Sequence, residues 1–127
     1  MPEGVIIPEI PYPDVRQAAD WLCRCFGFSE RLRIANHRSQ LTLDHGSIVV
    51  VFQETGISSH SNMVRVTDIN SHFARAQQSG VHILNPPTDY PYGERQYTAI
   101  DLAGHRWTFS QTIKDIDPFE WGGELFD

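Results

Sequence analysis

The segment Asp89–Tyr97, DYPYGERQY, concentrates side chains suited to holding a small molecule. Its tyrosine rings can stack on a planar ligand, and its carboxylates favour a ligand that carries a positive charge. The residues concerned are Tyr90, Tyr92, Tyr97, Asp89 and Glu94. A structural interpretation competes with this one, because the tyrosines can instead cover a sheet edge while Arg95 pairs with Glu94 or Asp101.

The second candidate segment is Asp101–Gln111, DLAGHRWTFSQ, a hairpin turn that runs into a strand. Strand alternation groups His105 with Trp107 and Phe109, on a face that should pack against a helix. We interpret His105 as a half-buried or strand-end histidine; with the other parity it would be a ligand or a general base. The opposite face then carries a polar set suited to hydrogen-bonding a ligand: Arg106, Thr108 and Ser110. Four further histidines are expected to be solvated: His37, His45, His72 and His82.

Nucleophilic catalysis and nucleotide chemistry are not indicated. No Ser/His/Asp or Cys/His arrangement orients a base against a nucleophile. GFSER, at Gly27–Arg31, is not a nucleophile elbow, because it lacks the second glycine and runs from helix to strand. There is also no glycine loop that would cradle a phosphate.

The composition indicates one folded domain without a nucleic-acid or membrane partner. The 127 residues can bury a single core, and 40% of them are hydrophobic. A net charge of -6 without a basic block offers no surface for phosphate backbones or anionic lipid. Cys23 and Cys25 are badly placed to bridge each other. Without a disulfide framework, a signal peptide or an apolar run of spanning length, we expect a cytoplasmic protein.

A repeated order of elements must position these segments. A β-branched run at Val5–Ile10 precedes a helical pattern in which Asp14 is the N-cap and Gly27 the stop. Three strands are predicted next, of which the last two are joined by a DHG turn: Phe28–Ile34, Gln40–Leu43 and Ser47–Gln53.

The second half of the chain repeats this order. A strand at Asn62–Val66 leads to a helix capped by Asp68 and stopped at Gly80. NPPTDYPYG is predicted to interrupt the first of the strands that follow, because a central strand would not carry its prolines. Those strands are Val81–Leu84, Arg95–Ile100 and His105–Gln111.

The sequence therefore predicts an α+β fold of two βαβββ modules that form a curled mixed β-sheet around a groove. Module one covers about residues 1–56 and module two about residues 57–113. Residues 114–127 form a C-terminal tail that docks or frays, and Trp121 favours docking.

Three motifs resemble those of a known family. Pro13–Phe28, PDVRQAADWLCRCFGF, and Val66–Val81, VTDINSHFARAQQSGV, are similar to the two helix-entry motifs of the vicinal oxygen chelate superfamily. This superfamily includes glyoxalase I, the extradiol dioxygenases, and the fosfomycin and bleomycin resistance proteins. DLAGHRWTFSQ is similar to its closing D-P-x-G hairpin, with Leu102 and Ala103 at the two middle positions. The resemblance implies a single glyoxalase/bleomycin-resistance-like domain, in which Asp89–Tyr97 closes over the groove.

Metal-using members of this superfamily hold a divalent ion through His, Gln and Glu side chains. The resemblance places the three ligand positions at residues that have lost this chemistry: Ile7, Ser61 and Thr108. It therefore implies a metal-free member without a cofactor. Two residues would rescue a metal site as fallback ligands if this placement slips: His60, which is next to Ser61, and Glu9, which is two residues beyond Ile7 on the same face. Glu54, at the end of the fourth strand, could add another carboxylate.

The resemblance to bleomycin resistance proteins implies a non-enzymatic protein that sequesters a planar ligand, with a cation favoured by the acidity of the chain. Its partners would be that small molecule and a second copy of the chain, as a homodimer. The implied binding residues are Tyr90, Tyr92, Arg95, Tyr97, Arg106, Thr108 and Ser110. Two alternatives stay open: a metal-dependent lyase or dioxygenase of the glyoxalase superfamily with displaced ligands, and a scaffold that pairs with another protein.

Overall fold

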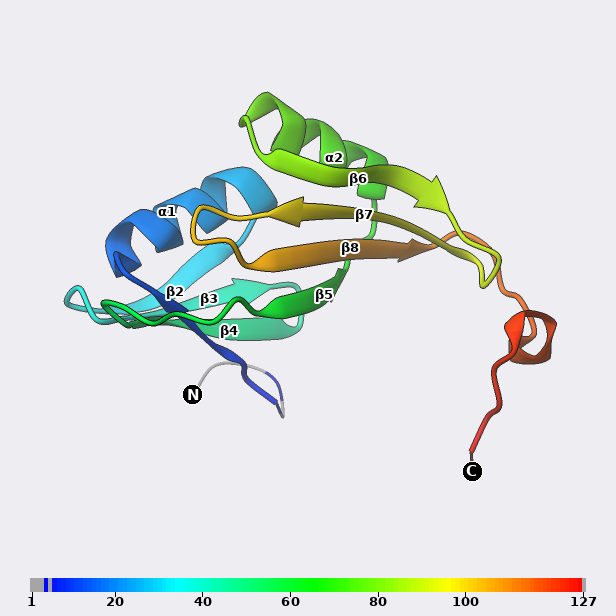
Figure 1. Ribbon diagram of the computed structural model, residues 1–127, viewed down its shortest axis with the longest axis horizontal. Coiled ribbons are helices and arrows are strands. Elements are labelled where there is room, and N and C mark those ends of the chain that lie inside the picture. Colours follow the sequence, from blue (N-terminus) through cyan, green and yellow to red (C-terminus); the bar gives the residue numbers. More distant parts are fainter. Residues whose placement is uncertain (1–3, 5, 127) are drawn as a thin grey trace. The chain divides into compact units, whose positions relative to one another are not determined.

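The chain folds as two compact units, each of which contains one βαβββ module. The computed structural model describes residue 4 and residues 6–126 (Figure 1). Unit one comprises Met1–His60 and Asp101–His105, and unit two comprises Ser61–Ile100 and Arg106–Asp127. The turn Asp101–His105 thus belongs with the first unit, although it lies between two strands of the second module in the chain. No helix in the described part of the chain is long and apolar enough to cross a membrane.

Unit one is built on a four-stranded mixed sheet with the strand order β1-β4-β3-β2. β1 lies parallel to β4, and the other neighbouring strands are antiparallel. The strands are β1 (Glu9–Tyr12), β2 (Ser29–Ile34), β3 (Arg38–Leu43) and β4 (Gly46–Phe52).

α1 (Val15–Phe26) covers one face of this sheet and supplies half of the core. Asp14 caps the helix by accepting a hydrogen bond from the Gln17 N–H, and Gly27 ends it with a φ of 83, a conformation that glycine adopts at little steric cost. Both predicted helix ends are confirmed. The buried face of α1 consists of Val15, Ala18, Ala19, Leu22, Cys25 and Phe26. It contacts β2, β3 and β4, whose buried residues include Leu41 and Val50.

Unit two repeats this arrangement with the strand order β5-β8-β7-β6 and with β5 parallel to β8. Its strands are β5 (Ser61–Arg65), β6 (His82–Asp89), β7 (Glu94–Ile100) and β8 (Arg106–Thr112). α2 (Ile69–Gln78) contacts β6, β7 and β8 and is capped by Asp68, as predicted. The fully buried side chains of this unit include Ile69, Ala76, Tyr97, Ala99, Trp107 and Phe109. The predicted fold of two βαβββ modules is therefore confirmed.

The first strand differs from its predicted position. β1 begins at Glu9 and continues to Tyr12, whereas the sequence predicts a strand over Val5–Ile10. Val5 lies outside the described residues. The shift follows from pairing, because β1 stays in register with Val49–Phe52 up to the end of β4. Pro11 and Tyr12 are thus part of the strand, and the Tyr12 side chain is fully buried.

β6 runs through Pro86 and Pro87, so the predicted interruption of this strand is wrong. β6 is an edge strand, so one of its sides has no neighbouring strand. Proline, which lacks an N–H group, is tolerated at such an edge because no partner strand there needs that donor. Its pairing with β7 is irregular, with register shifts between Ile83 and Asn85 and between Asn85 and Thr88. An edge strand tolerates both features, which explains why β6 extends to Asp89.

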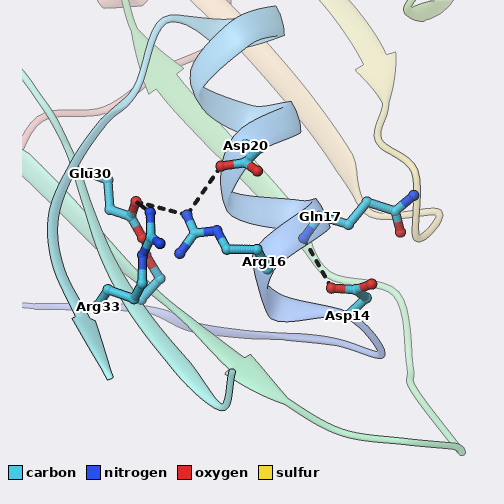
Figure 2. Close-up of polar contacts among 7 residues, drawn as sticks. Asp14, Arg16, Gln17, Asp20, Glu30 and Arg33 are labelled. Carbon is cyan, nitrogen blue, oxygen red and sulfur yellow. Dashed lines mark hydrogen bonds and ion pairs between the residues drawn. The ribbon is translucent and has the colours of Figure 1, made fainter. Parts of the chain in front are cut away.

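An ion-pair cluster joins α1 to the sheet of unit one (Figure 2). The Arg16 guanidinium lies 2.7 Å from Glu30 and 3.1 Å from Asp20. Glu30 also accepts hydrogen bonds from Arg33, at 3.1 Å, and from the buried Ser39 hydroxyl, at 2.5 Å. Burial opposes the ionisation of Glu30, but the hydrogen bonds from Ser39, Arg16 and Arg33 prevail and lower its pKa to about 2. The ionised Glu30 carboxylate therefore links α1 to β2 and β3.

Replacing Glu30 with glutamine should make the free energy of unfolding depend less on pH under acidic conditions. The pKa of Glu30 falls from 4.5 to about 2 on folding, so its contribution is complete above pH 4.5 and is lost as the pH falls toward 2. The wild-type chain should lose more unfolding free energy across this window than Glu30→Gln does. Urea denaturation at several pH values measures the difference, with Asp20→Asn as a control at a more exposed partner of Arg16. Equal slopes for wild type and Glu30→Gln would contradict this assignment.

Candidate ligand-binding site on the second sheet

The sheet of unit two has a face opposite α2, which we call the open face. Along β8, Trp107 and Phe109 are fully buried on the helix side, and Arg106, Thr108 and Ser110 alternate with them. Arg106 is exposed, Thr108 is half-buried and Ser110 is buried. The parity predicted for this strand is therefore confirmed, and the three polar side chains share the open face.

Strand pairing brings two further side chains beside Thr108. Thr98 of β7 is its cross-strand partner, and the two hydroxyl oxygens lie 3.0 Å apart. Met63 of β5 lies opposite Thr108 on the other side and is 68% exposed. The open face thus combines hydroxyl groups with an accessible thioether, and sulfur contacts aromatic rings favourably.

A directional chain of hydrogen bonds crosses the open face and ends at Glu94. The Tyr92 hydroxyl donates to Gln96 Oε1 at 3.1 Å, and Gln96 Nε2 donates to Ser110 Oγ at 3.0 Å. Ser110 in turn donates to Glu94 Oε1 at 2.7 Å. Because each group donates to the next, the Gln96 amide and the Ser110 hydroxyl are fixed in orientation.

Two tyrosines stack at the turn between β6 and β7. The rings of Tyr90 and Tyr92 lie 5.4 Å apart with 9° between their planes. Trp121, in the 3-10 turn η1 (Pro118–Trp121), packs edge-on against Tyr92 at 5.6 Å, so the tail docks as Trp121 suggested. Burial raises the pKa of Tyr92, and Tyr90 and Glu94 raise it further, so its hydroxyl stays protonated. We call Tyr90, Tyr92 and Trp121 the aromatic cluster.

Tyr97 lies in the core rather than on the open face. It is fully buried, packs against Phe73 and Phe109, and has its hydroxyl 2.5 Å from His72 Nδ1. Burial raises the pKa of Tyr97 well above its ordinary value. A buried ring cannot stack on a ligand, so the binding role predicted for Tyr97 is corrected to a core role. His72 is half-buried and packs on Phe109 at 4.2 Å, so its predicted solvation is also wrong.

Arg95 also lies on the side of β7 opposite Gln96. Its guanidinium binds both carboxylate oxygens of Asp89, at 2.6 and 3.1 Å, rather than pairing with Glu94 or Asp101. The hydrogen bonds and the charge of Arg95 lower the pKa of Asp89. The two charges neutralise each other, so neither residue is well placed to orient a ligand on the open face.

His105 is a structural residue of unit one. It is fully buried and packs against Tyr12, and its Nδ1 accepts a hydrogen bond from the His60 N–H at 2.8 Å. Because that nitrogen must be an acceptor, Nε2 carries the proton and donates to the Pro11 carbonyl at 2.7 Å. Both ring nitrogens are engaged, which excludes the roles of metal ligand and general base. His105 is thus more deeply buried than predicted.

Asp101 organises the turn that carries His105. Its Oδ1 accepts hydrogen bonds from the N–H groups of Ala103 and His105, at 2.9 and 3.0 Å. Its Oδ2 accepts a hydrogen bond of 2.5 Å from the Tyr12 hydroxyl. The turn therefore binds β1 through side chains and main chain together.

The three positions that the resemblance assigns to metal ligands carry no suitable donors. Ile7 precedes β1, Ser61 is exposed at the start of β5, and the Thr108 hydroxyl is bonded to Thr98. Aliphatic and neutral hydroxyl side chains are poor ligands for a divalent ion, so these positions do not fit a metal.

The fallback ligands do not assemble a metal site either. Glu9 forms an ion pair with Arg38, His60 packs its ring edge-on against His105, and Glu54 is exposed beyond β4. Across residue 4 and residues 6–126, no three His, Cys, Asp or Glu side chains are grouped as a metal ion would require.

Two βαβββ modules, each with a helix on one face of a four-stranded mixed sheet, define the vicinal oxygen chelate class of proteins. The chain belongs to the Glyoxalase/Bleomycin resistance protein/Dioxygenase superfamily, whose model matches residues 6–109. The resemblance inferred from the helix-entry and hairpin motifs is thus confirmed for the superfamily.

Solved structures with this fold include binding proteins and enzymes. TioX from Micromonospora sp. ML1 is 32% identical, with a TM-score of 0.80 over 86% of this chain and 98% of that one. TnmS3, an antibiotic binding protein from Streptomyces sp. CB03234, is 24% identical, with a TM-score of 0.71 over 87% and 96% of the two chains. A lactoylglutathione lyase from Agrobacterium tumefaciens is 12% identical, with a TM-score of 0.73 over 87% and 94%. The last two similarities show the fold alone.

The curated relatives that match are longer than this chain and are named as uncharacterized proteins. An uncharacterized protein of Mycobacterium bovis is 29% identical over 52 residues, which are 41% of this chain and 34% of that protein. An uncharacterized protein of Mycobacterium tuberculosis matches with the same identity over 31% of its length. The match thus spans about a third of the curated relatives.

Proposed function

We propose that this chain is a non-enzymatic small-molecule binding protein, similar to the bleomycin resistance proteins, that sequesters a planar ligand and favours a cationic one. One observation carries the proposal: the stacked rings of Tyr90 and Tyr92 adjoin an open sheet face lined by hydrogen-bonding side chains. Rings supply apolar contact, and a few placed polar groups supply orientation, which is the composition of a typical ligand site. The antibiotic binding protein TnmS3, which shares the fold, gives this proposal further support.

In this proposal the ligand is held by burial rather than by reaction. Its ring system packs on the aromatic cluster and on Met63, while Thr108 and Arg106 orient its polar edge. Ser110 acts indirectly, because its hydroxyl is already bonded to Gln96 and Glu94. We propose that the protein works as a homodimer in the cytoplasm, with no nucleic acid or membrane as partner.

A thermal-shift screen against divalent metals and planar cations tests this function. A ligand at about 100 times its dissociation constant should add about 2.7 kcal/mol to the unfolding free energy, which raises the melting temperature measurably. Metal analysis of protein purified without a His tag completes the test. Near-stoichiometric Zn, Ni, Mn or Fe that a chelator removes together with an activity would overturn the proposal in favour of a lyase or dioxygenase.

Replacing Tyr92 with leucine should weaken the binding of a planar cation about tenfold, because an aromatic contact is worth about 0.5–1.5 kcal/mol beyond its area. Isothermal titration with a planar dye found in the screen measures the loss. Phe52→Leu is the matched control, since Phe52 is an exposed aromatic residue of unit one. Equal losses in the two variants would remove the aromatic cluster from the site.

A further inference from the structure

We propose, on the basis of the binding function above, that Glu94 determines ligand specificity and selects a planar ring system that carries a protonated or hydrogen-bond-donating nitrogen. The feature that supports this assignment is the direction of the hydrogen bonds on the open face. Three side chains donate in sequence: Tyr92 donates to Gln96, Gln96 donates to Ser110, and Ser110 donates to the Glu94 carboxylate.

The chain of hydrogen bonds leaves an acceptor at its end. Gln96 uses its amide oxygen for Tyr92 and its amide nitrogen for Ser110, and Ser110 uses its single hydrogen for Glu94. An ionised carboxylate has about four lone-pair sites, and Ser110 occupies one of them on Oε1. The Glu94 carboxylate can therefore accept a further hydrogen bond, and a ligand that binds there must supply the donor.

The charge of Glu94 is uncompensated, unlike that of its acidic neighbour. Across residue 4 and residues 6–126, no ion pair involves Glu94. Asp89 is neutralised by the two-point contact with Arg95. Arg65 of β5 lies opposite Ser110 and is exposed, without an ion pair to Glu94. Of the two carboxylates in DYPYGERQY, only Glu94 thus has its charge available for a ligand.

The carboxylate and the tyrosine ring act at the same end of the sheet. The hydrogen bonds that run from the Tyr92 hydroxyl through Gln96 and Ser110 end on Glu94, so the phenol and the carboxylate belong to one connected group of side chains. In agreement with this geometry, the pKa of Tyr92 is raised by burial first, then by Tyr90 and then by Glu94. A ligand ring that packs on Tyr92 therefore comes within reach of Glu94. A positive charge is favoured there twice, by the face of the ring and by the carboxylate.

Two planar probes of similar shape test this inference. At neutral pH 9-aminoacridine is a cation with N–H donors, whereas acridine is mostly neutral. Wild type should bind 9-aminoacridine about tenfold more tightly than acridine, and Glu94→Gln should reduce this preference to about twofold by weakening the binding of the cation. The preference of wild type should also shrink in high salt. Glutamine keeps the oxygen that accepts from Ser110, and circular dichroism melting verifies that the variant is folded.

Asp44→Asn is the matched control for net charge. Asp44 lies in the β3–β4 turn of unit one with a φ of 50, which asparagine also tolerates. This variant should keep the full preference for the cation. If wild type and Glu94→Gln bind both probes with the same preference, Glu94 is not the selecting residue, although the binding function stands. If wild type binds neither probe, the proposed planar-ligand function itself is overturned, and the inference with it.

Discussion

Replacing His105 with alanine is expected to lower the free energy of unfolding by about 3–5 kcal/mol. The imidazole is fully buried and joins the His60 N–H to the Pro11 carbonyl. Alanine would leave a half-buried donor and a buried acceptor without partners and would open a cavity beside Tyr12, whose ring packs on His105 at 4.9 Å. Urea denaturation of the two proteins measures the difference.

The control for this substitution is His37→Ala, which removes an exposed imidazole from the turn between β2 and β3. Surface substitutions of this kind usually change stability by about 0.5 kcal/mol or less. A loss below about 1 kcal/mol for His105→Ala would contradict the structural role, because a single unsatisfied buried group already costs about 1–3 kcal/mol.

Replacing Gly93 with alanine should detach the tail from the aromatic cluster and destabilise unit two by about 2–4 kcal/mol. A Cβ atom at this position would lie 1.9 Å from the Lys114 carbonyl oxygen, and the φ of +88 is strained for alanine. The contact is close because Ile113 and Lys114 both donate N–H groups to the Gly93 carbonyl, at 2.9 and 3.2 Å. Relief of the clash must therefore move the start of the tail.

Gly80→Ala is the control that separates the cost of a positive φ from the cost of the steric clash. Gly80 has a φ of +78, and a Cβ atom there would meet nothing within 4 Å. It should therefore show only the conformational cost, about 1 kcal/mol. Acrylamide quenching of tryptophan fluorescence should rise for Gly93→Ala alone, because Trp121 would leave Tyr92. Equal quenching in both variants would contradict the expectation that the clash at residue 93 detaches Trp121 from Tyr92.

The helix ends could be predicted from the sequence because their signals are local. Asp14 and Asp68 each accept a hydrogen bond from an N–H three residues later, and Gly27 and Gly80 adopt positive φ values. The limits of β1 have no such local signal, because they depend on pairing with β4, which is distant in the chain. The full length of β6 is also not predictable from the sequence. Proline is excluded from central strands only, and the order of the strands in the chain does not reveal which strand lies at the edge.

The candidate site was predicted best where strand alternation was applied. On β8 it placed Arg106, Thr108 and Ser110 together. The same alternation along β7 would have put Tyr97 in the core, with Gln96 beside Ser110 and Thr98 beside Thr108. The contact of Trp121 with Tyr92 has no comparable signal, because an irregular tail carries no periodicity that specifies where it returns.

The scaffold alone does not decide between binding and catalysis, because a lactoylglutathione lyase and an antibiotic binding protein share it. The side chains on the strands carry that information. Here the positions that the family resemblance assigns to metal ligands hold Ile7, Ser61 and Thr108, while hydroxyl, amide and ring groups line the open face.

The proline pair of β6 has a consequence for self-association. An edge strand with free N–H and C=O groups is a template on which another chain can add a strand. Pro86 and Pro87 supply no N–H donors, and the register shifts beside them break the regular spacing that a new strand would need. This border is thereby protected from sheet extension and from aggregation. Two copies of the chain that associate would accordingly have to meet through side-chain surfaces or another edge, and not by continuing the second sheet across β6.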